Sequence, residues 1–92
     1  MLKLLSIELS PLKNKKLRAY FNDNTHTDFG QSGFSDYTIH HDDYRKQLYI
    51  QRHRKRENWN DPKSAGALSI YILWNKKSIK ASIADYKKRF HI

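Results

Sequence analysis

The residues best suited to chemistry lie in one stretch near the middle of the chain, where six basic and two acidic side chains fall within residues 42–56. In a helix, four side chains of this stretch share one stripe at i, i+4, i+7 and i+11: Arg45, Tyr49, Arg52 and Arg56. Arginine makes bidentate contacts to phosphate, and tyrosine can stack on a base. The pattern predicts a surface for a polyanion such as nucleic acid. The alternative is a basic helix face that is only solvated.

The charge of the whole chain favours the same class of ligand. Its 92 residues include 18 lysines and arginines but only nine aspartates and glutamates, which gives a formal net charge of +9. Clustered cations repel one another, and phosphates relieve that repulsion while counterions are released. We therefore expect Tyr49 to stack on bases and five residues to contact phosphates: Arg45, Arg52, Arg54, Lys55 and Arg56. Four lysines are expected to add contacts if the fold places them on the same side: Lys76, Lys77, Lys87 and Lys88.

A metal site is the main competing interpretation of the central stretch. It contains donor groups that zinc or manganese accepts, namely His40, His41, Asp42, Asp43 and His53. Their spacing matches no metal motif, and a continuous helix would separate His41 from His53 by roughly 18 Å of rise, too far for one shared ion. Nor does the spacing force together the carboxylates that a nuclease would need: Asp28, Asp36, Asp42 and Asp43. We therefore expect no metal, no cofactor and no catalytic residue.

Composition narrows the class of protein further. The absence of cysteine excludes a disulfide framework and zinc sites that use cysteine ligands. The opening residues are too short and too interrupted for a signal peptide, and no apolar run approaches the length of a membrane span. We expect a protein of the cytosol, the nucleus or the inside of a particle.

The first third of the chain is predicted to form a sheet. Apolar and polar residues alternate over residues 3–9, 16–21 and 25–29, which predicts three short antiparallel strands joined by tight turns. In the first strand, the alternation places Leu5, Ile7 and Leu9 on one side and Leu4, Ser6 and Glu8 on the other. In the second strand, it places Leu17, Ala19 and Phe21 on the inner side. Gly30 and Gly33 enclose a loop that leaves the sheet, and each can supply a positive φ.

Three helices are predicted to follow. The first begins at an N-cap of Asp42 or Asp43 and runs to about Arg56. The second starts at Asp61-Pro62, covers residues 63–74, and is apolar on most sides, which makes it the core helix. Ser78 caps the third, whose apolar stripe consists of Ile79, Ile83, Tyr86 and Phe90.

These elements predict an α+β fold in one domain, residues 1–92, strand-rich over 1–33 and helical over 37–92. We expect a small antiparallel three-stranded sheet followed by three helices packed on one of its faces. Trp74 lies in the apolar helix and is expected to belong to the core.

Over residues 26–90 the chain contains three distinctive strings, HTDFGQSGFSDYTIHHDD, YIQRHRKRENWNDP and AGALSIYILWNKKSIKASIADYKKRF. Together they resemble a small, uncharacterised family of basic proteins encoded by nucleocytoplasmic large DNA viruses, the giant viruses. Residues 67–71 depart from the bulkier, Trp-rich form of that family. The resemblance implies a viral protein of the host cytoplasm or nucleus, or of the virion, and it favours DNA over RNA. It supplies no catalytic residues.

The function expected from the sequence is therefore non-enzymatic nucleic-acid binding of low sequence specificity. The alternative is a structural virion or minor capsid component whose basic face contacts acidic capsid or core proteins, and a metal-dependent nuclease ranks third. No membrane partner is expected. Copurification separates the first two: a DNA binder brings nucleic acid that nuclease removes, and a capsid component brings protein.

Overall fold

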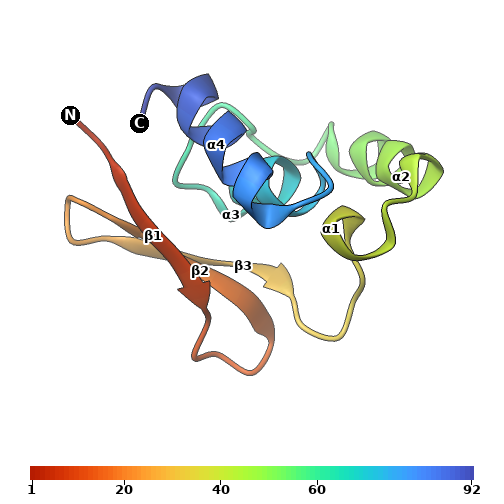
Figure 1. The fold of residues 1–92 in the computed structure, drawn as a ribbon, viewed down its shortest axis with the longest axis horizontal. Helices are drawn as coiled ribbons and strands as arrows, with labels where there is room; N and C mark the ends of the chain where they lie inside the picture. The colour runs from red at the N-terminus through yellow and green to blue at the C-terminus, as the bar shows by residue number, and fades with distance from the viewer.

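A three-stranded antiparallel sheet forms one layer of the molecule and the helices lie on one side of it, as a computed structural model of residues 1–92 shows (Figure 1). The strands lie in the order β1-β2-β3, with bounds Leu4–Leu9, Lys15–Phe21 and His26–Gln31. Four α-helices and one π-helical turn follow: α1 (Tyr37–His40), α2 (Asp43–His53), α3 (Ala65–Leu68), η1 (Ser69–Leu73) and α4 (Ile79–Phe90). The predicted α+β class is confirmed. None of these helices has both the length and the apolar character needed to cross a lipid bilayer.

The central strand β2 sets the register of the sheet. Ala19 of β2 is opposite Ile7 of β1 and Thr27 of β3, and it is completely buried. Phe21, two residues later, is also buried because successive side chains of a strand alternate between its faces. The predicted inner side of β2 therefore does face the core. Leu17, near the start of the strand, lies on the same side and is half-buried.

The first strand differs from its prediction in register. A bulge between Leu4 and Ser6 interrupts the pairing with β2, and an extra residue at a bulge shifts the alternation. Leu4 therefore faces the core, whereas Leu5 is 63% exposed. Ile7 packs against the core, whereas Leu9, predicted to lie on the same side of the strand, is exposed at its end.

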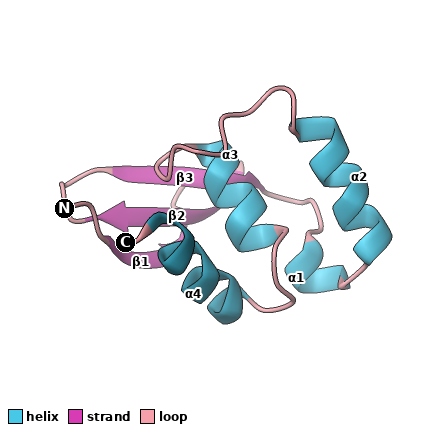
Figure 2. Ribbon diagram, turned by 90° about the horizontal axis from the view of Figure 1, so that it is seen from above, coloured by secondary structure: helices cyan, strands magenta, loops and turns pink.

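A short helix that the sequence did not predict, α1, connects the sheet to α2 (Figure 2). The buried Asp36 is its N-cap and accepts hydrogen bonds from the backbone and hydroxyl of Thr38. Lys16 of β2 pairs with the same carboxylate at 2.7 Å. His41 ends the helix in the left-handed conformation. This helix is held by tertiary contacts, which explains why local pattern did not reveal it.

The basic helix α2 begins as predicted and ends early. The Asp42 carboxylate caps it by accepting hydrogen bonds from the backbone N–H groups of Tyr44 and Arg45. The last helical residue is His53, so the prediction that the helix continues to Arg56 is wrong. Residues 54–56 form a turn instead, which leads the chain toward the start of α3 (Figure 2).

The predicted core helix is present as two joined pieces. It begins later than expected, because the Ser64 hydroxyl rather than Asp61 caps α3 by accepting from the Ala67 N–H. Beyond α3 the backbone widens into η1, in which the Trp74 N–H donates to the Ser69 carbonyl five residues earlier. The core role is confirmed, since these two pieces contribute five buried residues: Ala67, Leu68, Ile70, Ile72 and Leu73.

The last helix, α4, packs against η1 and closes the core. Ser78 caps it as predicted, accepting from the Ala81 N–H. Tyr86 of the predicted stripe is fully buried and donates its hydroxyl to the Pro62 carbonyl at 2.6 Å. Ile79, at the start of the stripe, is instead partly exposed.

Gly30 is a position where any side chain should be costly. Its φ is +77°, and a Cβ would lie 2.6 Å from Leu73 Cδ1 in η1. The Gly30→Ala variant should lose about 2–4 kcal/mol of unfolding free energy, because left-handed backbone and overpacking each cost about 1–2 kcal/mol or more. Gly33→Ala is the matched control: Gly33 has φ +86° but open space around it. Urea unfolding should show a clearly smaller loss for Gly33→Ala, and equal losses would contradict the packing argument.

Candidate functional site

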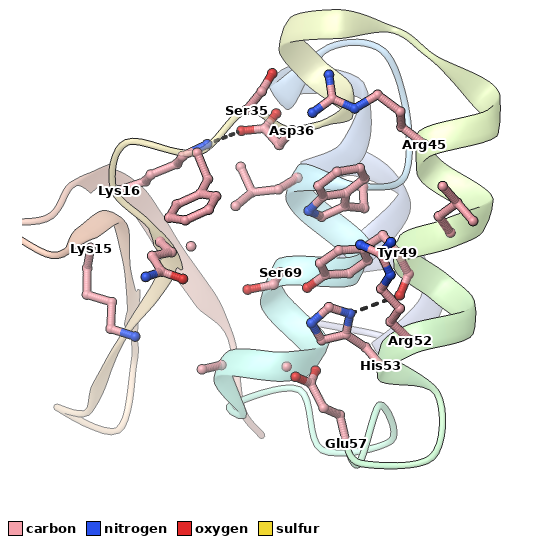
Figure 3. Close-up of a pocket in the computed structure, with 18 residues that line it drawn as sticks. Lys15, Lys16, Ser35, Asp36, Arg45, Tyr49, Arg52, His53, Glu57 and Ser69 are labelled. Carbon is pink, nitrogen blue, oxygen red and sulfur yellow. Dashed lines mark hydrogen bonds and ion pairs between the residues drawn. The ribbon is translucent and has the colours of Figure 1, made fainter.

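A cleft of about 460 Å³ lies between α2 and the beginning of β2 (Figure 3). On one side, α2 contributes Arg45, Tyr49 and Arg52. On the other side, β2 contributes Lys15 and Lys16. The floor comes from α3 and η1. We call this surface the basic cleft, because its four lysines and arginines outnumber its two acidic residues, Asp36 and Glu57.

Most of the positive charge in the basic cleft has no acidic partner. Lys16 is paired with Asp36, but Lys15, Arg45 and Arg52 form no ion pair. Figure 3 shows Lys15 on the strand side of the cleft and Arg45 on the α2 side. Glu57 is the only other acid, and its carboxylate accepts from the Trp59 indole N–H. The cleft therefore presents unpaired cations to any ligand that enters it.

An aromatic stack holds α2 against η1 and forms one wall of the cleft. The Tyr49 ring lies parallel to Trp74, with centroids 4.3 Å apart and 7° between planes. Its other face stacks on His53, with centroids 4.0 Å apart (Figure 3). His53 is one helical turn beyond Tyr49, and its Nδ1–H donates to the Tyr49 carbonyl. Trp74, predicted to belong to the core, is half-buried in this stack.

This stack changes the role expected for Tyr49. Because Trp74 and His53 cover both ring faces, Tyr49 has no face free for a base, and the predicted stacking role does not fit this geometry. Burial raises the pKa of Tyr49 to about 12, and the Glu57 carboxylate adds to the shift while the Ser69 hydroxyl opposes it. The phenol therefore remains protonated at neutral pH and is available as a hydrogen-bond donor at the cleft wall.

The structure brings only part of the predicted phosphate-binding set together. Arg45 and Arg52 line the basic cleft, but Arg54, Lys55 and Arg56 occupy the exposed turn after α2, because the helix stops at His53. The other four predicted residues are exposed at other places in the molecule. Lys76 and Lys77 precede α4, and Lys87 and Lys88 lie near its end. The last turn of α4 lies at the opposite end of the molecule from α2 (Figure 1).

Lys15 and Lys16 are cleft residues that the sequence did not indicate. Both begin β2, about thirty residues before Arg45, and no local pattern connects them with the helix. The chain brings them to the cleft only because β2 is the central strand and α1 turns α2 back across its end. Their signal in the sequence is limited to their charge.

The three histidines of the central stretch have separate surroundings. His53 belongs to the stack, His41 ends α1, and His40 packs near Trp74 with ring centroids 5.3 Å apart. His40 Nδ1 accepts a hydrogen bond from the Asp42 N–H, while its Nε2 is buried without a partner. No three histidine or acidic side chains converge in an arrangement suited to a metal ion.

His40 should make the stability of the fold depend on pH. Burial lowers its pKa, Arg45 and His41 add to that effect, and Asp42 and Asp36 oppose it. The unfolded chain therefore takes up this proton at higher pH than the folded chain. The contribution of neutral His40 to the unfolding free energy should therefore be complete above the ordinary histidine pKa of about 6.5. It should be lost as the pH falls from that value through the lowered pKa of His40 in the folded protein.

The variant His40→Asn tests this dependence. Its side-chain oxygen can replace Nδ1 as the acceptor for the Asp42 N–H, and it does not titrate. Melting temperatures measured between pH 7.5 and pH 5 should fall less for His40→Asn than for the natural chain. The acidic groups with lowered pKa values, Asp23, Asp28 and Asp85, titrate below this window. Identical pH profiles for the two proteins would show that His40 is not responsible.

Comparison with known proteins places the chain in a family. Neither the curated proteins nor the solved structures contain a match. A family described as a family of unknown function (DUF5754) matches residues 5–53, which is more than half of the chain. The match begins in β1 and ends at the last residue of α2, so it includes both side walls of the basic cleft. The protein therefore belongs to this family of unknown function (DUF5754).

Proposed function

We propose that this protein binds nucleic acid without chemically changing it, and that the basic cleft is the principal contact surface. One observation carries the proposal: Arg45 and Arg52 of α2 line the same cleft as Lys15 of β2, and none of them has an acidic partner. Unpaired cations held on two sides of one cleft repel each other. A phosphate backbone that enters the cleft relieves this repulsion and releases its own counterions.

The ion pairs of the whole molecule support the same conclusion. Only four of the eighteen lysines and arginines pair with a carboxylate: Lys16, Arg18, Lys63 and Arg89. The other fourteen carry the excess charge; Arg54, Lys55 and Arg56 follow α2 in the exposed turn after it, whereas Lys87 and Lys88 lie near the end of α4. Such a distribution attracts a polyanion from a distance and raises the rate of association.

Low sequence specificity follows from the residue types. Arginine and lysine contacts to phosphate fix the position of a nucleic acid but carry no sequence information. Tyr49, the aromatic group expected to stack on bases, is covered on both faces. We therefore propose contacts to the backbone, with DNA as the polymer because of the resemblance to proteins of large DNA viruses. On that basis the protein acts in the host cytoplasm or nucleus, or inside the virion. Competition between DNA and RNA of the same sequence tests the choice of polymer.

The salt dependence of binding is the direct test. Each contacted phosphate contributes about −0.9 to the slope of log K against log salt on duplex DNA, and about −0.7 on a single strand. With three unpaired cations in the cleft and further unpaired cations in the turn after α2, we expect a duplex slope steeper than about −3. Fluorescence anisotropy with labelled duplex and single-stranded oligonucleotides gives this slope. A flat dependence would contradict the proposal and point to a protein or small-molecule ligand.

A further inference from the structure

The largest group of exposed apolar side chains lies beside the basic cleft, in a second depression. Eight large hydrophobic side chains of this protein are exposed. Five of them line one open groove of about 540 Å³: Leu9, Leu12, Phe34, Ile39 and Ile79. We call this surface the apolar groove.

The fold, and not the sequence, gathers these side chains. Leu9 ends β1, Leu12 lies in the turn that follows, and Phe34 lies just after β3. In an antiparallel sheet the end of β1 and the end of β3 are at the same end, so these residues become neighbours. Ile39 comes from α1, and Ile79 is the first residue of α4. Five separate parts of the chain thus present apolar groups to one place.

The exposure of these side chains indicates a surface that another macromolecule covers. Leu9 is 84% exposed and Ile39 is 64% exposed. A contiguous apolar patch with polar groups at its rim is typical of a protein interaction site. Small-molecule sites enclose most of their ligand, whereas side chains this exposed form a shallow groove that would cover only one side of a small molecule.

The positive charge around the apolar groove indicates that its partner is acidic. Its lining includes Lys13, Lys15 and Lys16, and its only acidic residue is the buried Asp36, which Lys16 already neutralises. Lys13 and Lys15 form no ion pair. A second copy of this chain is a poor partner, because a two-fold interface would bring the lysines of both copies together on two chains of net charge +9. An acidic partner removes this repulsion.

We propose that the apolar groove docks an amphipathic helix of an acidic partner protein. The apolar stripe of that helix covers Leu9, Ile39 and Ile79, and its acidic side chains pair with Lys13 and Lys15. Hydrophobic grooves accept such helices through apolar anchors at i, i+3, i+4 and i+7. This interaction requires neither Arg45 nor Arg52, and it shares only Lys15 with the nucleic-acid contacts proposed above.

A designed peptide provides the probe. It carries leucines at i, i+3, i+4 and i+7 with glutamates on the flanking positions, and a shuffled peptide of the same composition lacks the stripe. Titration of the amphipathic peptide into ¹⁵N-labelled protein should shift the amide signals of the groove residues. The shuffled peptide should bind at least about tenfold more weakly, because it offers the same charge without aligned anchors. Absence of groove shifts, or equal binding by the shuffled peptide, overturns the proposal.

Variants of exposed residues locate the interaction. Leu9→Ser with Ile39→Ser should weaken binding of the amphipathic peptide about tenfold or more, whereas Leu5→Ser with Tyr44→Ser should leave it unchanged. Leu5 and Tyr44 are exposed apolar residues outside the groove, and the amide spectra of both double variants report whether the fold is retained. Both variants should keep their affinity for DNA. Equal weakening by the two variants, or a dimer in sedimentation experiments that only the Leu9 and Ile39 changes abolish, overturns the assignment to an acidic helix.

Discussion

Replacing Lys15, Arg45 and Arg52 with glutamine is expected to weaken nucleic-acid binding by about 100-fold or more at 0.1 M salt. Each of these side chains lines the basic cleft without an ion pair. Each contact to a phosphate contributes a slope of about −0.7 to −0.9, which at 0.1 M salt corresponds to roughly a factor of five to eight per contact. Binding of unrelated sequences should weaken alike, and the salt slope should become shallower by about one for each lost contact.

A control with the same change of charge distinguishes the cleft from net charge. Lys3, Lys87 and Lys88 are exposed, and the first strand begins and α4 ends on the side of the molecule away from α2 (Figure 1). Exposed charges farther apart than about 10 Å are largely screened at 0.1 M salt, so replacing these three with glutamine should have a small effect. Equal losses from the two triple variants would show that only total charge matters. Circular dichroism should show both variants folded, since surface substitutions seldom cost more than about 0.5 kcal/mol.

The fold class could be predicted because its signals are local. The alternation that buries Ala19 and Phe21 is a property of a single strand. The caps at Asp42 and Ser78 depend on a side chain and the amides two or three residues beyond it. Such patterns are visible in the chain before it folds.

The features that the sequence did not reveal depend on distant contacts. The bulge in β1 is defined by its pairing with Phe21 and Tyr20, and α1 is capped by an aspartate that Lys16 holds from β2. The π-helical turn adds one residue to a helical turn whose apolar pattern fits an ordinary helix equally well. Periodicity alone does not distinguish these arrangements from regular ones.

In the basic cleft, too, local patterns were visible in the sequence and long-range contacts were not. Arg45 and Arg52 share a helix face because of their spacing, so the sequence indicates that they act together. Their separation from Arg56 and their proximity to Lys15 follow from where α2 ends and how it lies beside the sheet. The covering of Tyr49 by Trp74, twenty-five residues later, is likewise a tertiary contact. Local spacing therefore indicated that the two arginines lie on one face, and it assigned the tyrosine a role that its neighbours prevent.

The core gives the second large expected effect: Ile72→Ala should cost about 2–5 kcal/mol of unfolding free energy. Ile72 has no exposed surface and lies in η1, within the cluster that joins Phe21 and Phe29 of the sheet to Tyr86 of α4. Truncating it leaves a cavity among groups from both layers. Because a domain of this size is stable by only about 5–15 kcal/mol, the variant should lose a large part of its stability. Urea unfolding and thermal melting measure the loss.

Two further isoleucines, which are less buried than Ile72, serve as controls for the unfolding free energy of Ile72→Ala. Ile83 of α4 is half-buried at the edge of the same cluster, so Ile83→Ala should cost less than Ile72→Ala. Ile39 is 64% exposed in α1, so Ile39→Ala should change the unfolding free energy by no more than about 0.5 kcal/mol. The three variants remove the same atoms, and burial is the difference between them. If all three unfold at the same urea concentration, η1 is not the centre of the core. A graded series with Ile72 at the top would show that the π-helical turn joins the sheet to α4.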